Sequence, residues 1–65
     1  MKKYLIVGAG GFIAGHLINK LKNEGNFIRA VDIKPNEFWF QRFNEIENFT
    51  LDMTKIENCL KMTKD

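Results

Sequence analysis

The sequence predicts an α/β fold in which short parallel strands alternate with helices. A β-branched and aromatic run, Lys3 to Val7, ends at a glycine and is typical of a buried strand. Apolar residues then recur at spacings of three and four from Phe12 to Leu21, which indicates a helix. Phe27 to Asp32 is a second strand-like run. A strand, a helix and a strand within about thirty residues form a βαβ unit, whose two strands lie parallel.

Size and composition limit the classes of protein to consider. The chain has 65 residues, below the roughly 100 to 150 of a usual domain, so we expect one domain at most. Its hydrophobic content of 45% and charged content of 28% are those of an ordinary folded chain. The net charge is +2 and the basic residues are scattered among acidic ones, which gives no indication of nucleic-acid binding. Cys59 is the single cysteine and has no second cysteine for a metal pair, so we expect no metal site.

The amino-terminal segment superficially resembles a secretory signal, because Lys2 and Lys3 precede an apolar stretch. Four glycines interrupt that stretch, and the apolar core of a signal peptide has no need of them. No apolar run reaches the roughly 18 residues of a membrane span. We therefore expect a cytoplasmic protein with no membrane partner.

The first helix should end near Glu24, because Gly25 suits a left-handed carboxyl-terminal cap. Lys34-Pro35-Asn36 is the turn after the second strand, and the aromatic-rich stretch from Glu37 to Ile46 is expected to be a short helix or an irregular cover. The buried face of the first helix is predicted to comprise Ile13, Ala14, Leu17, Ile18 and Leu21.

A third strand is predicted at Asn48 to Leu51, followed by a helix from about Lys55 to Met62. Thr54 and Glu57 have the spacing of a capping box at the start of that helix. Its inward face is predicted to comprise Ile56, Cys59, Leu60 and Thr63. In the predicted strand order 3-2-1 the first strand is an open apolar edge, which favours homo-oligomers.

The segment that indicates chemistry is Gly8-Ala9-Gly10-Gly11-Phe12-Ile13-Ala14, at the junction of the first strand and the first helix. In this Gly-x-x-Gly-x-x-Ala pattern, Gly8 allows a sharp turn and Gly11 leaves room for a pyrophosphate against the backbone. Ala14 allows the helix to lie close to the sheet. The free amides and positive dipole end of the helix can bind the anion without a basic side chain.

Asp32 lies at the end of the second strand, 24 residues after Gly8. A carboxylate there accepts hydrogen bonds from the adenosine ribose and repels a 2′-phosphate, which favours NAD over NADP, although Lys34 could partly compensate. The alternative is that the glycines only make a tight turn and Asp32 only caps a loop. The combination predicts a β-α-β-(x)-β-α portion of a Rossmann-type parallel sheet, with residues 1–65 as a partial NAD(P)-binding domain.

The run from Gly8 to Leu17 resembles the fingerprint of extended short-chain dehydrogenases/reductases, the NAD-dependent epimerases and dehydratases of sugar nucleotides. With Asp32, Asp52 and the run 57–64, the chain is most similar to the GDP-mannose 3,5-epimerase subfamily. The resemblance implies that Phe12 and Ile13 lie along the phosphates and that Asp52 and Met53 border the adenine. For Asp52 an equally good interpretation is a residue that precedes a helix and binds no ligand. Ala14, Gly15 and the stretch Glu37 to Asn48 depart from the family pattern.

The resemblance also implies a catalytic Tyr-x-x-x-Lys pair, with the tyrosine as acid and base. The single tyrosine is Tyr4, with Gly8 four residues later, so we expect no catalytic residue in this chain. His16 is expected to pack or to lie at the surface. The hypothesis is therefore an NAD-binding amino-terminal segment of a nucleotide-sugar epimerase or dehydratase that is not active alone and meets the nucleotide sugar only in a complete enzyme. A short nucleotide-binding or protein-interaction module is the alternative, and whether the chain itself is an enzyme stays open.

Overall fold

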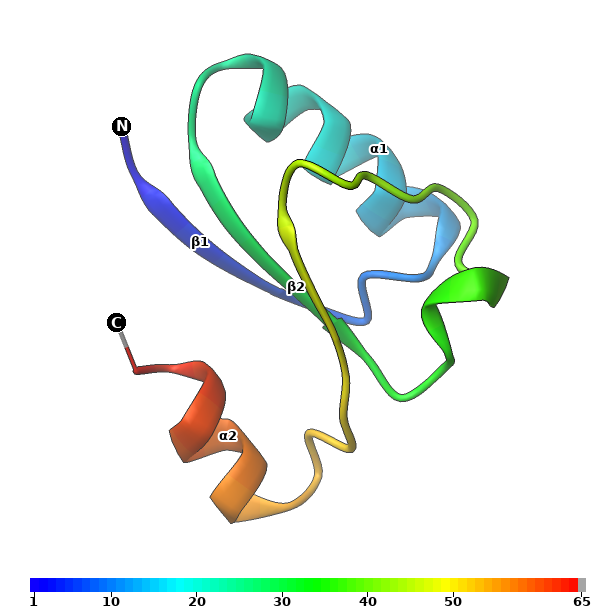
Figure 1. Cartoon of the computed structure of the whole chain (residues 1–65), viewed down its shortest axis with the longest axis vertical. Helices are drawn as coiled ribbons and strands as arrows, with labels where there is room; N and C mark the ends of the chain where they lie inside the picture. Colours follow the sequence, from blue (N-terminus) through cyan, green and yellow to red (C-terminus); the bar gives the residue numbers. More distant parts are fainter. Residues whose placement is uncertain (65) are drawn as a thin grey trace.

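Three strands, two α-helices and one short 3-10 helix follow one another along residues 1–64, the part of the chain that this computed structural model describes. In chain order they are β1 (Lys3–Val7), α1 (Phe12–Asn23), β2 (Phe27–Asp32), the 3-10 helix η1 (Asn36–Phe38), β3 (Glu47–Thr50) and α2 (Ile56–Met62). Figure 1 shows the two α-helices beside a twisted sheet. The predicted elements are present, and β3 begins one residue earlier than the sequence indicated.

The sheet is wholly parallel and has the order β1-β2-β3, with β2 at its centre. Tyr4 lies opposite Ile28 in the first pair of strands, and Asp32 lies opposite Thr50 in the second. Parallel strands need crossovers, and α1 and the segment that includes η1 supply them. The predicted α/β class with a parallel Rossmann-type sheet is therefore confirmed.

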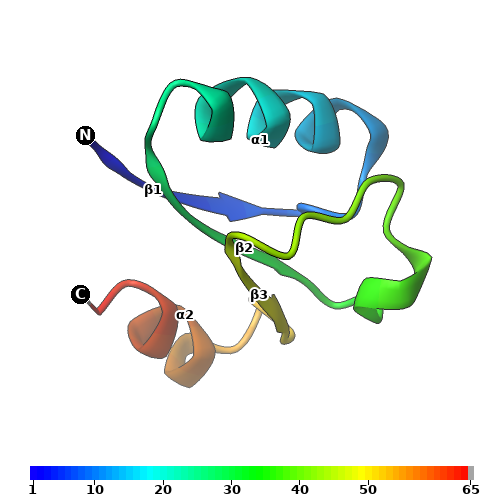
Figure 2. The same cartoon turned by 45° about the horizontal axis from the view of Figure 1, so that its top comes forward.

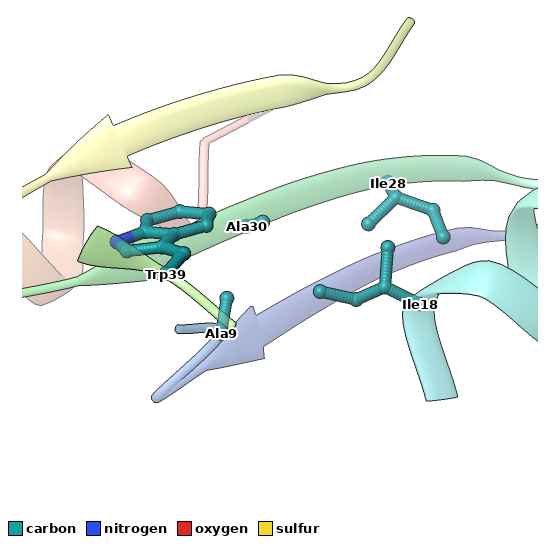
Figure 3. Packing of buried hydrophobic residues seen from close by; sticks show 5 residues of the cluster. All are labelled: Ala9, Ile18, Ile28, Ala30 and Trp39. Atoms are coloured by element: carbon teal, nitrogen blue, oxygen red, sulfur yellow. The ribbon is translucent and has the colours of Figure 1, made fainter. Parts of the chain in front are cut away.

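The apolar core lies between α1 and the sheet. Ile18 of α1 and Ile28 of β2 are each 1% exposed and lie against one another, while Ala9, Ala30 and Trp39 continue the cluster towards the carboxyl end of β2 (Figure 3). The small alanines leave room for the indole ring, which comes from the crossover between β2 and β3. A residue far along the chain thereby closes the core over the loop that follows β1.

The buried face of α1 is only in part the predicted one, because Ile18 and Leu21 pack in the core as expected but other predicted residues do not. Gly15 and Ile18 are buried, whereas Ile13 is 81% exposed and Leu17 is 45% exposed. A Cβ atom on Gly15 would lie 3.3 Å from Cβ of Gln41, so the absence of a side chain lets the crossover approach the helix. The helix therefore turns its small residues to its neighbours, and one flank of apolar side chains stays exposed.

The carboxyl end of α1 is as predicted. Glu24 is the cap residue, and Gly25 has a φ of 82°, in the left-handed region that favours glycine. The Gly25 amide donates to the Lys22 carbonyl at 3.0 Å. The chain then turns through Asn26 into β2.

Helix α2 lies on the opposite face of the sheet from α1, as Figure 2 shows. Arg29 alternates with Ile28 along β2, so its side chain points to the α2 face. Its Nε donates to Oε1 of Glu47 in β3 at 2.8 Å, and its Nη1 donates to the carbonyls of Met62 and Lys64. One guanidinium thus joins β2, β3 and the carboxyl end of α2.

The predicted capping box at the start of α2 is wrong. The cap residue is Lys55, which has no side-chain cap hydrogen bond. The hydroxyl of Thr54 donates instead to Oδ1 of Asp52 at 2.6 Å. The Thr54 amide, which the Glu57 carboxylate would accept in a capping box, also donates to Oδ1 of Asp52, at 3.0 Å. Asp52 lies only two residues away, so it competes with Glu57 for that amide.

The predicted inward face of α2 is wrong in part. Ile56 is 69% exposed and Leu60 is 60% exposed, whereas Met62 is 3% exposed and Cys59 is half-buried. A helix that begins one residue later than expected and is held by Arg29 at its carboxyl end presents Met62 to the sheet. The apolar residues at Ile56 and Leu60 remain at the surface.

The outer edge of β1 has no partner strand among residues 1–64. The Phe27 amide donates to the Lys2 carbonyl and the Gly8 amide donates to the Val31 carbonyl, so the even-numbered residues of β1 point their backbone groups towards β2. The odd-numbered residues therefore turn their amides and carbonyls to the open edge. They are Lys3, Leu5 and Val7.

Candidate functional site

The turn after β1 brings the glycine-rich segment to the carboxyl edge of the sheet. Gly8 has a φ of 77°, and its amide donates to the Val31 carbonyl at 2.9 Å. The Gly11 amide donates back to the Gly8 carbonyl at 3.2 Å. No atom lies within 4 Å of where a Cβ on Gly8 would stand, so Gly8 is needed for its backbone conformation and not for space.

The amino end of α1 offers free amide groups. Gly11 is the cap residue and supplies no side-chain cap, and the first helical hydrogen bond runs from the Gly15 amide to the Gly11 carbonyl at 3.0 Å. The amides of Phe12 and Ile13 precede that bond, so they have no partner within the helix. No acidic residue lies in the first turn. This end of the helix can therefore accept an anion such as a phosphate.

Asp32 stands beside the glycine loop. Its Oδ2 accepts a hydrogen bond from the Gly10 amide at 2.8 Å, and its Oδ1 accepts one from the Lys34 amide at 3.0 Å. A carboxylate oxygen can accept more than one hydrogen bond, so both oxygens keep capacity for further donors. The ends of β1 and β2 thus meet as the sequence indicated, with a half-buried carboxylate between them.

Gly10 makes contacts in this loop that the sequence analysis did not single out. Its carbonyl accepts from the Phe40 amide at 3.0 Å, and a Cβ atom there would lie 2.7 Å from Cδ1 of Trp39 and 3.0 Å from Oδ2 of Asp32. The adjacent glycines at 10 and 11 were the available signal. The contact with Trp39 could not be read from the sequence, since the two residues lie 29 positions apart.

Asp52 and Met53 follow β3 at the same edge of the sheet. The Leu51 amide donates to the Asp32 carbonyl at 3.0 Å, which joins the end of β2 to this segment. Oδ1 of Asp52 accepts from both the hydroxyl and the amide of Thr54. These bonds, with the nearby charge of Lys55, hold the pKa of the Asp52 carboxyl below its ordinary value. Asp52 therefore organises the turn before α2, while Met53 lies half-buried beside it.

Some aromatic residues near the loop pack in the core, and others are exposed at the surface. Trp39 is 5% exposed and Phe43 packs against the core, whereas Phe38 is 64% and Phe40 is 57% exposed. Phe40 lies edge-on to Phe12, with ring centroids 4.6 Å apart. The exposed ring of Phe40 therefore borders the amino end of α1.

His16 is exposed and contacts Phe12 edge-on, with ring centroids 4.7 Å apart.

Among the described residues no three His, Cys, Asp or Glu side chains gather in a way that could hold a metal ion. None of the helices in residues 1–64 has both the length and the apolar character to cross a membrane.

Comparison of the sequence with known proteins identifies its family. A model described as the NAD dependent epimerase/dehydratase family matches residues 4–65. GDP-mannose 3,5-epimerase of Arabidopsis thaliana is 44% identical over 62 residues, covering 95% of this chain and 16% of the relative. GDP-mannose 3,5-epimerase 1 of Oryza sativa subsp. indica is 43% identical over 58 residues, covering 89% of this chain and 15% of the relative. Protein CapI of Staphylococcus aureus is 35% identical over 69 residues, covering 95% and 20% respectively.

Proposed function

Because the chain belongs to the NAD-dependent epimerase/dehydratase family, we propose that residues 1–65 form the adenosine-side half of an NAD-binding site. The observation that carries the proposal is the hydrogen bond from the Gly10 amide to Asp32, which holds a carboxylate beside the amino end of α1. A pyrophosphate at that helix end would leave the adenosine ribose near the carboxylate.

Each residue has a proposed part in binding. Gly8 turns the chain away from β1, and Gly11 leaves the backbone open to the pyrophosphate. The amides of Phe12 and Ile13 donate to phosphate oxygens, and Asp32 accepts the ribose hydroxyls. The adenine is bordered by Asp52 and Met53. When bound, NAD supplies a hydride acceptor, and this half of the site supplies affinity and orientation.

We propose that the parent activity is that of a nucleotide-sugar epimerase of the GDP-mannose 3,5-epimerase type. The identity to two such relatives supports this, although the chain spans about a sixth of their length. Tyr4, the single tyrosine, lies in β1 and has Gly8 four positions later, so the chain contains no Tyr-x-x-x-Lys pair. We therefore expect binding without turnover by this chain alone, and we propose the cytoplasm, where NAD is available, as its compartment.

The proposal predicts that Asp32→Ala lowers the affinity for NAD and ADP-ribose by about tenfold or more, because hydrogen bonds to a charged acceptor contribute roughly 1.5–3 kcal/mol. Calorimetric titration of both ligands would measure the change. Glu37→Ala removes an exposed carboxylate from η1 and serves as the matched control, which should bind like the wild type. Equal affinity of the wild type and Asp32→Ala, or no binding by a folded wild type, would refute the proposed half-site.

A second proposal concerns assembly. The open edge of β1 carries three sets of unpaired backbone groups, and Val7 at its end is 56% exposed. We expect a second copy of the chain to pair along this edge, because unprotected apolar edges favour strand addition. Val7→Lys should therefore shift the chain towards monomer in sedimentation velocity over a concentration series. Thr50→Lys, at the exposed end of β3, is the control. A wild type that stays monomeric throughout the series would contradict this expectation.

A further inference from the structure

Trp39 contacts the glycine loop at a position with no assigned role in binding the nucleotide. A Cβ atom on Gly10 would lie 2.7 Å from Cδ1 of the indole, so ring and loop are in close contact. The next residue, Phe40, donates its amide to the Gly10 carbonyl at 3.0 Å. Two consecutive residues of the crossover thereby fix Gly10 from two sides.

The indole is itself held firmly. It is 5% exposed and lies against Ala9 and Ala30, as Figure 3 shows. Its Nε1 donates to the Lys34 carbonyl at 2.7 Å. A buried ring with its single polar atom satisfied has little freedom to move. Phe38, one residue earlier, is 64% exposed.

Among residues 1–64, the two backbone donors to the Asp32 carboxylate belong to residues that this ring contacts. The Gly10 amide donates to Oδ2, and the ring contacts Gly10. The Lys34 amide donates to Oδ1, and the ring binds the carbonyl of the same residue. The two hydrogen bonds that orient Asp32 therefore start from backbone groups on either side of Trp39.

We propose that Trp39 is a positioning residue that fixes the orientation of the Asp32 carboxylate and so sets the selectivity of the site for NAD over NADP. The inference rests on the proposed nucleotide site. A fixed carboxylate accepts the ribose hydroxyls and repels a 2′-phosphate. A carboxylate that is free to rotate binds the ribose hydroxyls less tightly and repels the 2′-phosphate less strongly.

The test compares Trp39→Leu with the matched control Phe38→Leu. In Trp39→Leu, calorimetry should give an NAD affinity reduced by roughly tenfold, as expected when a hydrogen bond to a charged group is weakened. The NADP affinity should fall less, so the ratio of the two dissociation constants should move towards one. Phe38→Leu should leave both affinities and their ratio unchanged.

Amide hydrogen exchange gives a readout that requires no nucleotide. In Trp39→Leu the amides of Gly10 and Lys34 should exchange faster, while the Arg29 amide, which faces β1 in the centre of the sheet, keeps its protection if the chain is folded. Trp39→Phe keeps an aromatic ring but loses the Nε1 bond, so it should accelerate the Lys34 amide more than the Gly10 amide. Unchanged exchange at both amides in Trp39→Leu would overturn the positioning role.

The outcomes separate this inference from the proposed function. If the folded wild type binds no nucleotide but both amides accelerate in Trp39→Leu, the nucleotide site fails, the selectivity claim fails with it, and the orientation of Asp32 by Trp39 stands. If the wild type binds NAD and Trp39→Leu keeps both its affinity and its NAD-to-NADP ratio, the nucleotide site stands and the inference is wrong.

Discussion

Gly10→Ala should destabilise the chain by about 2–3 kcal/mol, a cost typical of overpacking a tight contact. The added methyl group would stand 2.7 Å from the indole of Trp39 and 3.0 Å from the carboxylate of Asp32. The ring cannot move aside cheaply, because it is buried against Ala9 and Ala30. A chain of this size has a free energy of unfolding of roughly 3–10 kcal/mol, so the expected loss is a large fraction of the total stability. Urea unfolding followed by circular dichroism would measure it.

Gly11→Ala is the matched control for this prediction. Its Cβ atom would have one neighbour, the Gly8 carbonyl oxygen at 3.5 Å, which is an ordinary van der Waals contact. Its φ of −79° is available to any residue. We expect a change in the free energy of unfolding of a few tenths of a kcal/mol, since alanine is a somewhat poorer cap residue than glycine. Equal losses in the two variants would show that Gly10 is not held against Trp39.

Ile18→Ala should cost about 3 kcal/mol, because truncation of a buried isoleucine loses apolar burial and leaves a cavity. Ile18 is 1% exposed and faces Ile28 across the core. Thermal or urea unfolding would measure the loss. The same change at Ile13, which lies on the same helix and is 81% exposed, should alter stability by less than about 0.5 kcal/mol. A larger loss of stability at Ile13 than at Ile18 would mean that α1 packs against the sheet through the face that carries Ile13.

The sequence was sufficient for the elements but not for the faces they bury. The strand runs, the glycine turn and the cap at Gly25 depend on local conformational preference, and the structure has them where they were predicted. The face of α1 depends on what packs against it. Spacing predicted Ile18 and Leu21 correctly. It could not exclude Ile13 and Leu17 from the buried face, because these positions also fit helical spacing.

The start of α2 shows a second limit. Thr54 and Glu57 have a capping-box spacing, but Oδ1 of Asp52 accepts the Thr54 amide that the Glu57 side chain would accept in the box. A pattern that considers one acceptor cannot weigh a competing one. In the candidate site, Gly8, Gly11 and Asp32 were predicted from spacing. The contact between Gly10 and Trp39 depends on the tertiary fold. The aromatic-rich stretch from Glu37 to Ile46 has no periodicity that would have predicted this contact.

Because of the Arg29 guanidinium, the helices on the two faces of the sheet are attached to it by different kinds of interaction. Helix α1 is held by apolar side chains, whereas α2 is held by one charged group bound to Glu47 and to carbonyls at its carboxyl end, with Met62 as its one buried side chain. Added salt weakens ionic contacts at a partly exposed site and leaves apolar burial intact. We therefore expect helix α2 to open at a lower free energy than the rest of the chain, so that the sheet can release its last helix without losing the glycine loop.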